Sequence, residues 1–396
     1  MKPLVVTAHT LVSALGIGGD EHLKAIQRNY CGLRPCSFED TDLDTWIGMV
    51  DAVREERISP ALYQYDCRNN RLAQLALRTD GFENKVNHLK QKYGPERIGV
   101  FIGTSTSGIH QLEKAIWHMS QGNENLPSDY HYRQTHNYYS VGDFTRRYLG
   151  LLGPSHVVST ACSSSAKVFA TAARCIETGL CDAALVGGVD SLCSTTLYGF
   201  KSLDLISKLP CRPWDANRSG ISIGEGAGFA LLESQSKTDG DLALYGYGES
   251  SDAYHMSRPH PQGLGARLAI EQALANAEIS GADIDHVLLH GTGTLANDAA
   301  EDLAVRAALG TNVSCSSIKG ATGHTLGAAG ILNSIICLQA LKYSVIPATC
   351  NTLAKDPELS VNIALSVTHR PSNYALSNAF GFGGSNCSLI FGKLNT

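Results

Sequence analysis

Short apolar strand patterns alternate with amphipathic helix patterns along most of the chain, and this alternation constrains the fold more than any other feature. Strands are predicted at residues 4–8, 97–103, 182–189, 226–232, 242–246, 286–290, 313–316, 375–378 and 388–391, with a further strand beginning at residue 157. Helices are predicted at residues 21–28, 69–79, 140–149, 266–277, 298–309 and 326–342, with two more that end near residues 119 and 179. Such an order favours an α/β protein with helices on both faces of largely parallel sheets.

The alternation runs twice. Polarity rises at residues 233–241, ESQSKTDGD, and the strand and helix patterns then begin again. We therefore expect an N-terminal half at residues 1–240 and a C-terminal half at residues 241–396. Only the order of elements suggests a duplication, because no repeat of individual residues is visible.

Composition excludes several classes of protein. A formal charge of −5 gives no basic field, so nucleic acid is not an expected partner. The 12 cysteines form no C-x-x-C pair and no Cys/His cluster at zinc spacing, so we expect neither a metal nor another cofactor. The sequence shows no export signal and no apolar run near the roughly 20 residues that span a bilayer. We expect a cytoplasmic protein.

The segment at 157–174, VVSTACSSSAKVFATAAR, joins a β-branched strand to a helix, with Cys162 at the junction. A thiol at a helix N-terminus faces unpaired N–H groups and the positive end of the helix dipole, which favour the thiolate. The small neighbouring residues would admit a substrate, and the Cys162 N–H could face an oxyanion. Cys162 is therefore the candidate nucleophile, although a buried cysteine is usually only a small apolar residue.

Two histidines lie in glycine-rich segments at predicted strand exits. His290 ends the strand in LLHGTGT, and His324 lies in KGATGHTLGAAG. Functional groups of open α/β sheets gather at the carboxyl ends of strands, where Cys162 also falls. We therefore expect the three side chains to share one site.

One thiol and two imidazoles favour acyl transfer with carbon–carbon bond formation. A cysteine hydrolase needs one histidine and an orienting Asn or Asp, so a second histidine would be unused. A reaction in which the thiol holds an acyl group while two N–H donors stabilise an enolate uses both rings. The flanking glycines would let an extended thioester arm approach the backbone.

Six ordered blocks carry a resemblance to a known family. They are TACSS at 160–164, RPWDANRSGISIGEGAG at 212–228, SDAYHM at 251–256, HGTGT at 290–294, KGATGHTLGAAG at 319–330 and NAFGFGGSN at 378–386. Across essentially its whole length the chain resembles the elongating β-ketoacyl-acyl carrier protein synthases, which are condensing enzymes of the thiolase fold. The resemblance implies two α/β halves packed as five α-β-α-β-α layers.

The resemblance also implies a decarboxylative Claisen condensation, in which malonyl-acyl carrier protein extends an acyl group held on Cys162 by two carbons. His290 and His324 would aid decarboxylation and stabilise the enolate. The remaining implied roles are an oxyanion hole from the backbone N–H groups of Cys162 and Phe382, an acyl gate of Phe380, Phe382, Asp252 and His255, and pantetheine binding by Thr292 and Thr294.

Lys319 resembles the lysine that organises the histidine network in this family. Its usual carboxylate partner stands eleven residues after the first histidine, where this chain has Glu301. A second glutamate is common nine residues after the second histidine, but position 333 is Asn. This departure removes one buried negative charge and leaves open how Lys319 is neutralised.

The resemblance implies an acidic acyl carrier protein as partner, and a homodimer or a heterodimer with a homologous chain-length factor. Our candidates for carrier docking are Arg68, Arg71 and Lys208, although each could equally be a solvated surface charge. The segment at 181–200, the short segment before Arg212 and Asn333 favour the ketosynthases of bacterial aryl polyene or related polyketide clusters.

Several alternatives stay open at this point. The first is a housekeeping fatty-acid elongating synthase. Chain-initiating synthases and thiolases are less favoured, because the Cys-His-Asn set and the second catalytic cysteine are not in their expected blocks. A non-catalytic subunit that shapes a partner's pocket and a cysteine hydrolase complete the set.

Overall fold

The computed structural model describes residues 1–234, 237–238 and 240–394. The link predicted at 233–241 includes residues 235, 236 and 239, which lie outside the described residues. The predicted strands and helices are present with shifted ends. Sequence patterning did not predict α3 (Phe82–Tyr93), which packs on the N-terminal half, or the short helices α7 (Ser194–Ser202) and α10 (Lys319–Thr322).

Strands of the two halves form one continuous hydrogen-bonded path. In sheet order, the N-terminal half contributes β6 (Ser155–Val158), β5 (Ile98–Gly103), β7 (Ala183–Asp190), β9 (Gly226–Ser234) and β1 (Leu4–Ser13). The C-terminal half continues with β10 (Leu242–Ser251), β17 (Ser385–Lys393), β16 (Tyr374–Gly381), β11 (His286–Leu288), β12 (Ser314–Ser316) and β14 (Asn362–Ile363). The halves join where β1 pairs antiparallel with β10 at Leu4–Leu244 and Val5–Ala243.

The expectation of largely parallel sheets is wrong for the middle of this path. Parallel pairing is confined to β6-β5-β7 at one end and to β16-β11-β12-β14 at the other. The strands between them pair antiparallel. A short turn, Phe382–Gly384, joins β16 to β17, and a connection that short permits only antiparallel pairing.

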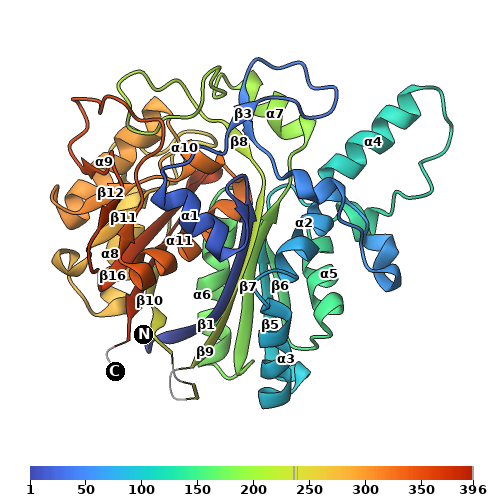
Figure 1. Cartoon of the computed structure of the whole chain (residues 1–396), viewed down its shortest axis with the longest axis horizontal. Coiled ribbons are helices and arrows are strands. Elements are labelled where there is room, and N and C mark those ends of the chain that lie inside the picture. The colour runs from blue at the N-terminus through green and yellow to red at the C-terminus, as the bar shows by residue number, and fades with distance from the viewer. Residues whose placement is uncertain (235–236, 239, 395–396) are drawn as a thin grey trace.

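Two helices lie between the halves. They are α6 (Ser164–Glu177) and α11 (Ala329–Tyr343), which contact each other and strands of both halves. Figure 1 shows them in the centre of the molecule. At Gly330, an added Cβ would lie 2.4 Å from the backbone nitrogen of Ala166, so this pair of helices needs glycine where they meet.

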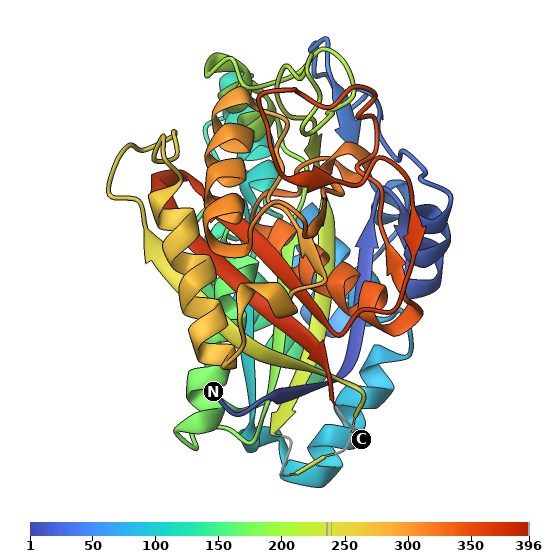
Figure 2. The ribbon, with the colours of Figure 1, turned by 90° about the vertical axis from the view of Figure 1, so that its left-hand side faces the viewer.

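Outer helices complete five layers. On the N-terminal half, α2 (Arg68–Leu77), α3 and α5 (Ser140–Leu149) pack on the sheet, and on the C-terminal half α8 (Leu264–Ala277) packs on β10 and β17 with α9 (Leu295–Leu309) beside it. Figure 2 shows α8 and α9 across the outer face of the C-terminal strands. This arrangement confirms the predicted α-β-α-β-α order.

The central helix α11 is apolar on every side, which explains its position. All residues from Ala329 to Leu341 are buried. The stretch Leu326–Tyr343 is long and apolar enough to pass for a membrane span, but 89% of it is buried inside the protein, as in a core helix. By length and composition it is the one such helix among the described residues.

The remaining elements are short or peripheral. The helices are α1 (Gly19–Gln27), α4 (Ile109–Ser120), α7 (Ser194–Ser202) and α10 (Lys319–Thr322), and the strands are β2 (Gly16–Ile17), β3 (Arg34–Pro35), β4 (Trp46–Gly48), β8 (Ile223–Gly224), β13 (Val345–Ile346) and β15 (Thr368–His369). In Figure 1, α4 and the loop after it extend away from the body. The carboxyl ends of β6, β11 and β12 lead into the segments that carry Cys162, His290 and Lys319.

Candidate active site

Cys162 occupies the tight turn between β6 and α6. Ala161 has a φ of 52°, the left-handed region that L side chains rarely adopt, and α6 begins two residues after the thiol at Ser164. Cys162 is 5% exposed. The turn therefore holds the sulfur near the start of α6, as predicted, but inside the protein.

Burial decides the resting state of this thiol. It raises the pKa of Cys162 to about 11, although Lys319 and the backbone N–H groups of Phe382 and of Cys162 itself pull that pKa downward. The predicted preference for thiolate is thus wrong for the resting site, since desolvation outweighs the helix terminus. The same two N–H groups are those predicted to form an oxyanion hole, and both interact with the sulfur.

The structure brings the thiol and the two predicted histidines together. The ligand atoms of Cys162, His290 and His324 all lie within 4.8 Å of one another. The two imidazole rings meet edge to face, with centroids 5.3 Å apart at an angle of 81°. Segments from both halves of the chain therefore build one site around the sulfur.

Both rings are neutral at neutral pH. Burial, with Lys319 second, moves the pKa of His290 and of His324 well below the ordinary value. The Nδ1 atom of His324 accepts a hydrogen bond from the backbone N–H of Leu326 at 3.2 Å, so the proton of this ring is on Nε2. Each ring thus carries one N–H donor and no charge.

Glu301 holds the backbone at His290. Its carboxylate accepts hydrogen bonds from the N–H groups of His290 at 2.7 Å and Gly291 at 2.8 Å, and from the Asn378 side chain at 3.1 Å. Burial nevertheless raises the pKa of Glu301 to about 7. These bonds fix the turn from which the His290 ring projects.

Lys319 acts on the same turn from the other side. Its buried ammonium donates to the carbonyl oxygen of His290, and burial lowers its pKa. Both Lys319 and Glu301 lie in the described part of the chain, and no ion pair of 4.0 Å or less joins them. The direct pairing implied by the resemblance is therefore replaced by separate contacts with His290.

Asn333 has a clear structural role. Its side-chain Nδ2 donates to the carbonyl oxygens of Leu289 at 3.2 Å and Asn378 at 3.4 Å. Both acceptors are backbone oxygens, one directly after β11 and the other within β16, so an amide donor suits this position and a carboxylate would not. The departure from Glu thus matches the local hydrogen-bond acceptors.

A cavity of about 280 Å³ opens onto the sulfur. Its lining includes Cys162, both histidines and all six side chains predicted for the gate and the pantetheine arm: Phe380, Phe382, Asp252, His255, Thr292 and Thr294. The Thr292 and Thr294 hydroxyls lie 2.9 Å apart, and Thr294 also caps α9 by accepting from the Asn297 N–H. The site therefore has an access route lined by the predicted residues.

The two predicted gate loops are hydrogen-bonded to each other. The N–H of Gly383 donates to the Met256 carbonyl at 2.7 Å, and the N–H of Asp252 donates to the Gly384 carbonyl at 2.8 Å. The Asp252 carboxylate accepts from the Asn386 side chain at 2.8 Å. A movement of the loop at Phe382 would therefore have to break contacts with the loop at 252–256.

Two of the cavity-wall residues that sequence reasoning missed, Phe200 and Arg258, bear on function. The Phe200 ring packs on Phe382 with centroids 5.5 Å apart, and Arg258 contributes an exposed cation. Among the described residues, no ion pair involves Arg258. Arg258 lies three residues after His255, in the loop that the resemblance assigns to the acyl gate. This position is the sequence signal that could have pointed to it.

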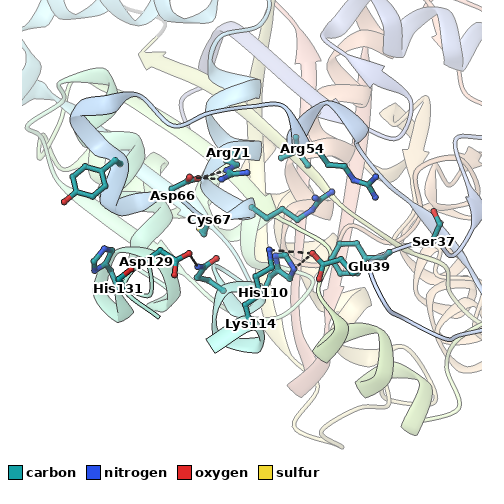
Figure 3. A pocket seen from close by; sticks show the side chains of 16 residues that line it. Ser37, Glu39, Arg54, Asp66, Cys67, Arg71, His110, Lys114, Asp129 and His131 are labelled. Carbon is teal, nitrogen blue, oxygen red and sulfur yellow. Dashed lines mark hydrogen bonds and ion pairs between the residues drawn. The ribbon is translucent and has the colours of Figure 1, made fainter. Parts of the chain in front are cut away.

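A larger cavity of about 800 Å³ lies elsewhere, beside α2 and the start of α4 (Figure 3). Arg68 and Arg71 line it, but both are paired. Arg68 makes two hydrogen bonds with the fully buried Glu225, at 2.6 and 2.8 Å, and Arg71 is paired with Asp66. Because a buried carboxylate needs its partner, Arg68 is not a free docking cation.

Lys208 differs from these arginines. Its side chain is 74% exposed and lies 3.8 Å from the equally open Asp44. Such a pair contributes little and is easily exchanged for another partner. Of the three predicted docking residues, Lys208 is the one that presents its charge to solvent.

Known families and structures match this chain over most of its length. The descriptions "Beta-ketoacyl synthase, N-terminal domain" and "Beta-ketoacyl synthase, C-terminal domain" match residues 69–238 and 243–353. The 3-oxoacyl-(acyl-carrier-protein) synthase 2 of Vibrio cholerae is 35% identical over 75% of this chain and 76% of its own length. The protein of that name from Rhizobium meliloti is 30% identical over 98% of both chains.

Solved structures of ketosynthases are also similar to this chain. The ketosynthase ApeO, in complex with its chain length factor ApeC from Xenorhabdus doucetiae, superposes with a TM-score of 0.92 at 35% identity, covering 99% of this chain and 98% of its own. The ishigamide ketosynthase/chain length factor gives a TM-score of 0.91 at 26% identity over both full chains. The chain belongs to the β-ketoacyl synthase family of condensing acyltransferases.

Proposed function

We propose that the chain holds an acyl group on Cys162 and condenses it with malonyl-acyl carrier protein, giving a β-ketoacyl-carrier two carbons longer. The observation that carries this proposal is the convergence of Cys162, His290 and His324 within 4.8 Å in a cavity open to the substrate. A hydrolase uses one histidine, so the second ring would have no role. Two neutral N–H donors, in contrast, can both stabilise an enolate.

The first half-reaction is acyl transfer. The sulfur attacks the thioester carbonyl, and the oxyanion is held by the N–H groups of Cys162 and Phe382, which already interact with the sulfur. The proton of Cys162 leaves with the carrier thiol as the tetrahedral intermediate collapses. Acylation removes the titrating thiol, so the sulfur carries no charge when the malonyl carrier binds.

The second half-reaction is decarboxylation and condensation. The N–H donors of His290 and His324 stabilise the negative charge on the malonyl thioester oxygen as CO2 leaves. The resulting carbanion attacks the acyl carbonyl on Cys162, and the sulfur departs as a thiolate that takes up a proton from solvent. Lys319 and Glu301 are positioning residues in this scheme, since both bind the backbone at His290.

We propose an acyl carrier protein as the substrate partner, received by Arg258, which lines the cavity, and by the exposed Lys208, three residues after the cavity-lining Leu205. Support comes from their exposure and from the names of the relatives, which are acyl-carrier-protein synthases. We also propose pairing with a chain-length factor or a second copy, as in the ApeO complex. Retention of Cys162 favours the catalytic position in such a pair over a pocket-shaping one.

The pathway we propose is bacterial aryl polyene or related polyketide biosynthesis. Support comes from the likeness to ApeO over 99% of this chain, while the 35% identity to the Vibrio cholerae synthase keeps housekeeping fatty-acid elongation as the second candidate.

We also propose that the chain divides into halves at 1–240 and 241–396. The break between the two matched regions, at residues 238 and 243, supports this division. We place the protein in the cytoplasm, where its 12 free thiols would persist.

Intact-mass measurement after incubation with an acyl-carrier thioester tests the nucleophile. One acyl adduct should map to Cys162, should be absent from Cys162→Ala, and should persist in Cys193→Ala, which removes another buried thiol at a helix start. An adduct in Cys162→Ala, or none in the unmodified chain, overturns the proposal. A panel of saturated and polyene acyl-carriers, run with and without a chain-length factor, separates the two pathways.

A further inference from the structure

Three segments meet under the short helix α10 and bring two cysteines together. Cys31 follows α1, and Cys350 lies in the loop after β13. The side chain of Asn351 lies between them, with Nδ2 at 3.5 Å from the Cys31 sulfur and Oδ1 at 3.5 Å from the Cys350 sulfur. The Cys350 sulfur is also 3.8 Å from the Asn29 carbonyl oxygen, directly beside the segment that carries Cys31.

The two thiols also share one packed cluster. Cys350 is buried in it with Ala321 of α10, and Cys31 packs against it. The neighbouring Cys350 thiol lowers the pKa of Cys31, with help from the Asn351 amide, whereas the pKa of Cys350 is raised. Cys31 is therefore the thiol of the pair that loses its proton first.

Accessibility distinguishes Cys31 from the other thiols. Of the 12 cysteines, all within the described residues, ten are buried and only Cys31 and Cys36 are partly exposed. A thiol with a lowered pKa that solvent can reach, next to a second thiol, has the features of a redox-sensitive cysteine and its resolving partner.

We propose that Cys31 and Cys350 form an oxidisable dithiol, a modification site at which a hydroperoxide generates a disulfide beneath α10. The inference is independent of the condensing function, because neither thiol lines the cavity at Cys162.

The reaction balances with a hydroperoxide as the oxidant. The Cys31 thiolate attacks the peroxide oxygen, the O–O bond breaks, and Cys31 becomes a sulfenic acid while one alcohol or water is released. The Cys350 sulfur then attacks the Cys31 sulfur, the S–O bond breaks, and the hydroxyl leaves as water with the Cys350 proton. Two electrons pass from the thiols to the peroxide, and a thiol reductant reverses the change.

The position of this dithiol connects it to the catalytic region. Asn351 Nδ2 donates to the Gly320 carbonyl at 2.7 Å, and the Cys31 sulfur lies 3.5 Å from the same oxygen. Gly320 follows Lys319, whose ammonium binds the carbonyl of His290. Closing the disulfide would therefore act on the helix that presents Lys319.

Peptide mapping of the full chain tests the proposal. The protein is treated with hydrogen peroxide at pH 7, free thiols are blocked with N-ethylmaleimide, and the digest is searched for a 31–350 linked peptide. We expect that peptide in the unmodified chain and in Cys36→Ser, which removes the other partly exposed thiol. We expect it to disappear after dithiothreitol. Before oxidation, iodoacetamide should label Cys31 about tenfold faster than Cys36.

A second variant keeps the test decisive if the link is not seen. In Cys350→Ser the resolving thiol is gone, so Cys31 should stop at the sulfenic acid and be trapped by dimedone. Absence of the linked peptide in the folded, unmodified chain overturns the proposal. Equal dimedone trapping on Cys31 with and without Cys350 also overturns it, because Cys350 would then have no resolving role.

Discussion

The backbone N–H of Leu326 donates a hydrogen bond to Nδ1 of His324 at 3.2 Å, and this contact sets what the ring can do. With Nδ1 occupied as an acceptor, the ring proton is on Nε2 and faces the site as a donor. Burial keeps the ring uncharged, because it moves the pKa well below its ordinary value. A neutral donor stabilises an enolate oxygen without first protonating the substrate.

Removal of either ring should separate the two half-reactions. In His290→Ala and His324→Ala, malonyl decarboxylation should fall about 10²–10³-fold, the usual loss for one oxyanion donor. Acylation of Cys162 should persist, since its oxyanion is held by backbone N–H groups. CO2 release and adduct mass are measured in parallel, with His88→Ala on the exposed face of α3 as control. Full decarboxylation in both variants would remove the role assigned to the histidines.

Position 333 offers a test of local electrostatics. Asn333→Glu would aim a carboxylate at the carbonyl oxygens of Leu289 and Asn378, so we expect it to cost about 1–3 kcal/mol of unfolding free energy at pH 7.5. Asn333→Gln is the matched control, because it has the length of Glu and keeps the amide. The difference should shrink toward pH 5, where the buried carboxyl takes up a proton and can donate. Equal urea midpoints for the two variants at pH 7.5 would show that this site does not select a donor.

Much of this site follows from sequence, because its residues lie in short motifs at strand ends. Cys162, His290 and His324 could be brought together from their positions beside glycine-rich turns, and all three line one cavity. The sheet was harder. Alternating helices and strands do not reveal that β16 and β17 are joined by a short turn, and so the antiparallel centre was not predicted.

Charge partners were the least predictable part. Arg68 looks like an open cation at a helix start, but its partner Glu225 lies 157 residues away and is buried. The partner of Lys319 was also predicted wrongly. Its ammonium binds the backbone oxygen of His290, and a sequence motif shows side chains but not which backbone oxygen lies within reach. Thiol ionisation depends on the depth of burial at Cys162, which only the packed structure shows.

Buried neutral histidines should make the fold sensitive to acid. Burial lowers the pKa of His22 to about 4, so between pH 6.5 and 4 the unfolded chain binds a proton that the folded chain does not. Stability therefore falls as pH drops, and His22 alone should cost about 1.4 kcal/mol between pH 7.5 and 5.5. Urea unfolding of His22→Gln should show a pH dependence smaller by that amount, while His88→Gln should match the unmodified chain. An unchanged pH dependence in His22→Gln would show that this ring takes up a proton in the folded chain as readily as in the unfolded chain.

Carrier docking should depend on two exposed cations, Arg258 in the cavity wall and Lys208 three residues after the cavity-lining Leu205. Lys208→Glu and Arg258→Glu should each lower kcat/KM for an acyl-carrier substrate about 5–10-fold, mostly through association, and the effect should diminish at high salt. A short acyl-pantetheine substrate lacks the acidic protein and should react as before with the Lys208 variant. Lys85→Glu, on the far helix α3, is the control. Loss of activity toward both substrates in the Lys208 variant would indicate damage to the site instead.

Condensation on Cys162 is tested most sharply when CO2 and product are measured together, with the purified chain, its partner subunit where needed, an acyl-carrier and malonyl-acyl carrier protein. We expect one CO2 released for each β-ketoacyl-carrier formed, two carbons longer than the acyl donor, and none of this product with Cys162→Ala. Free fatty acid without CO2, or elongation that continues in Cys162→Ala, would contradict it.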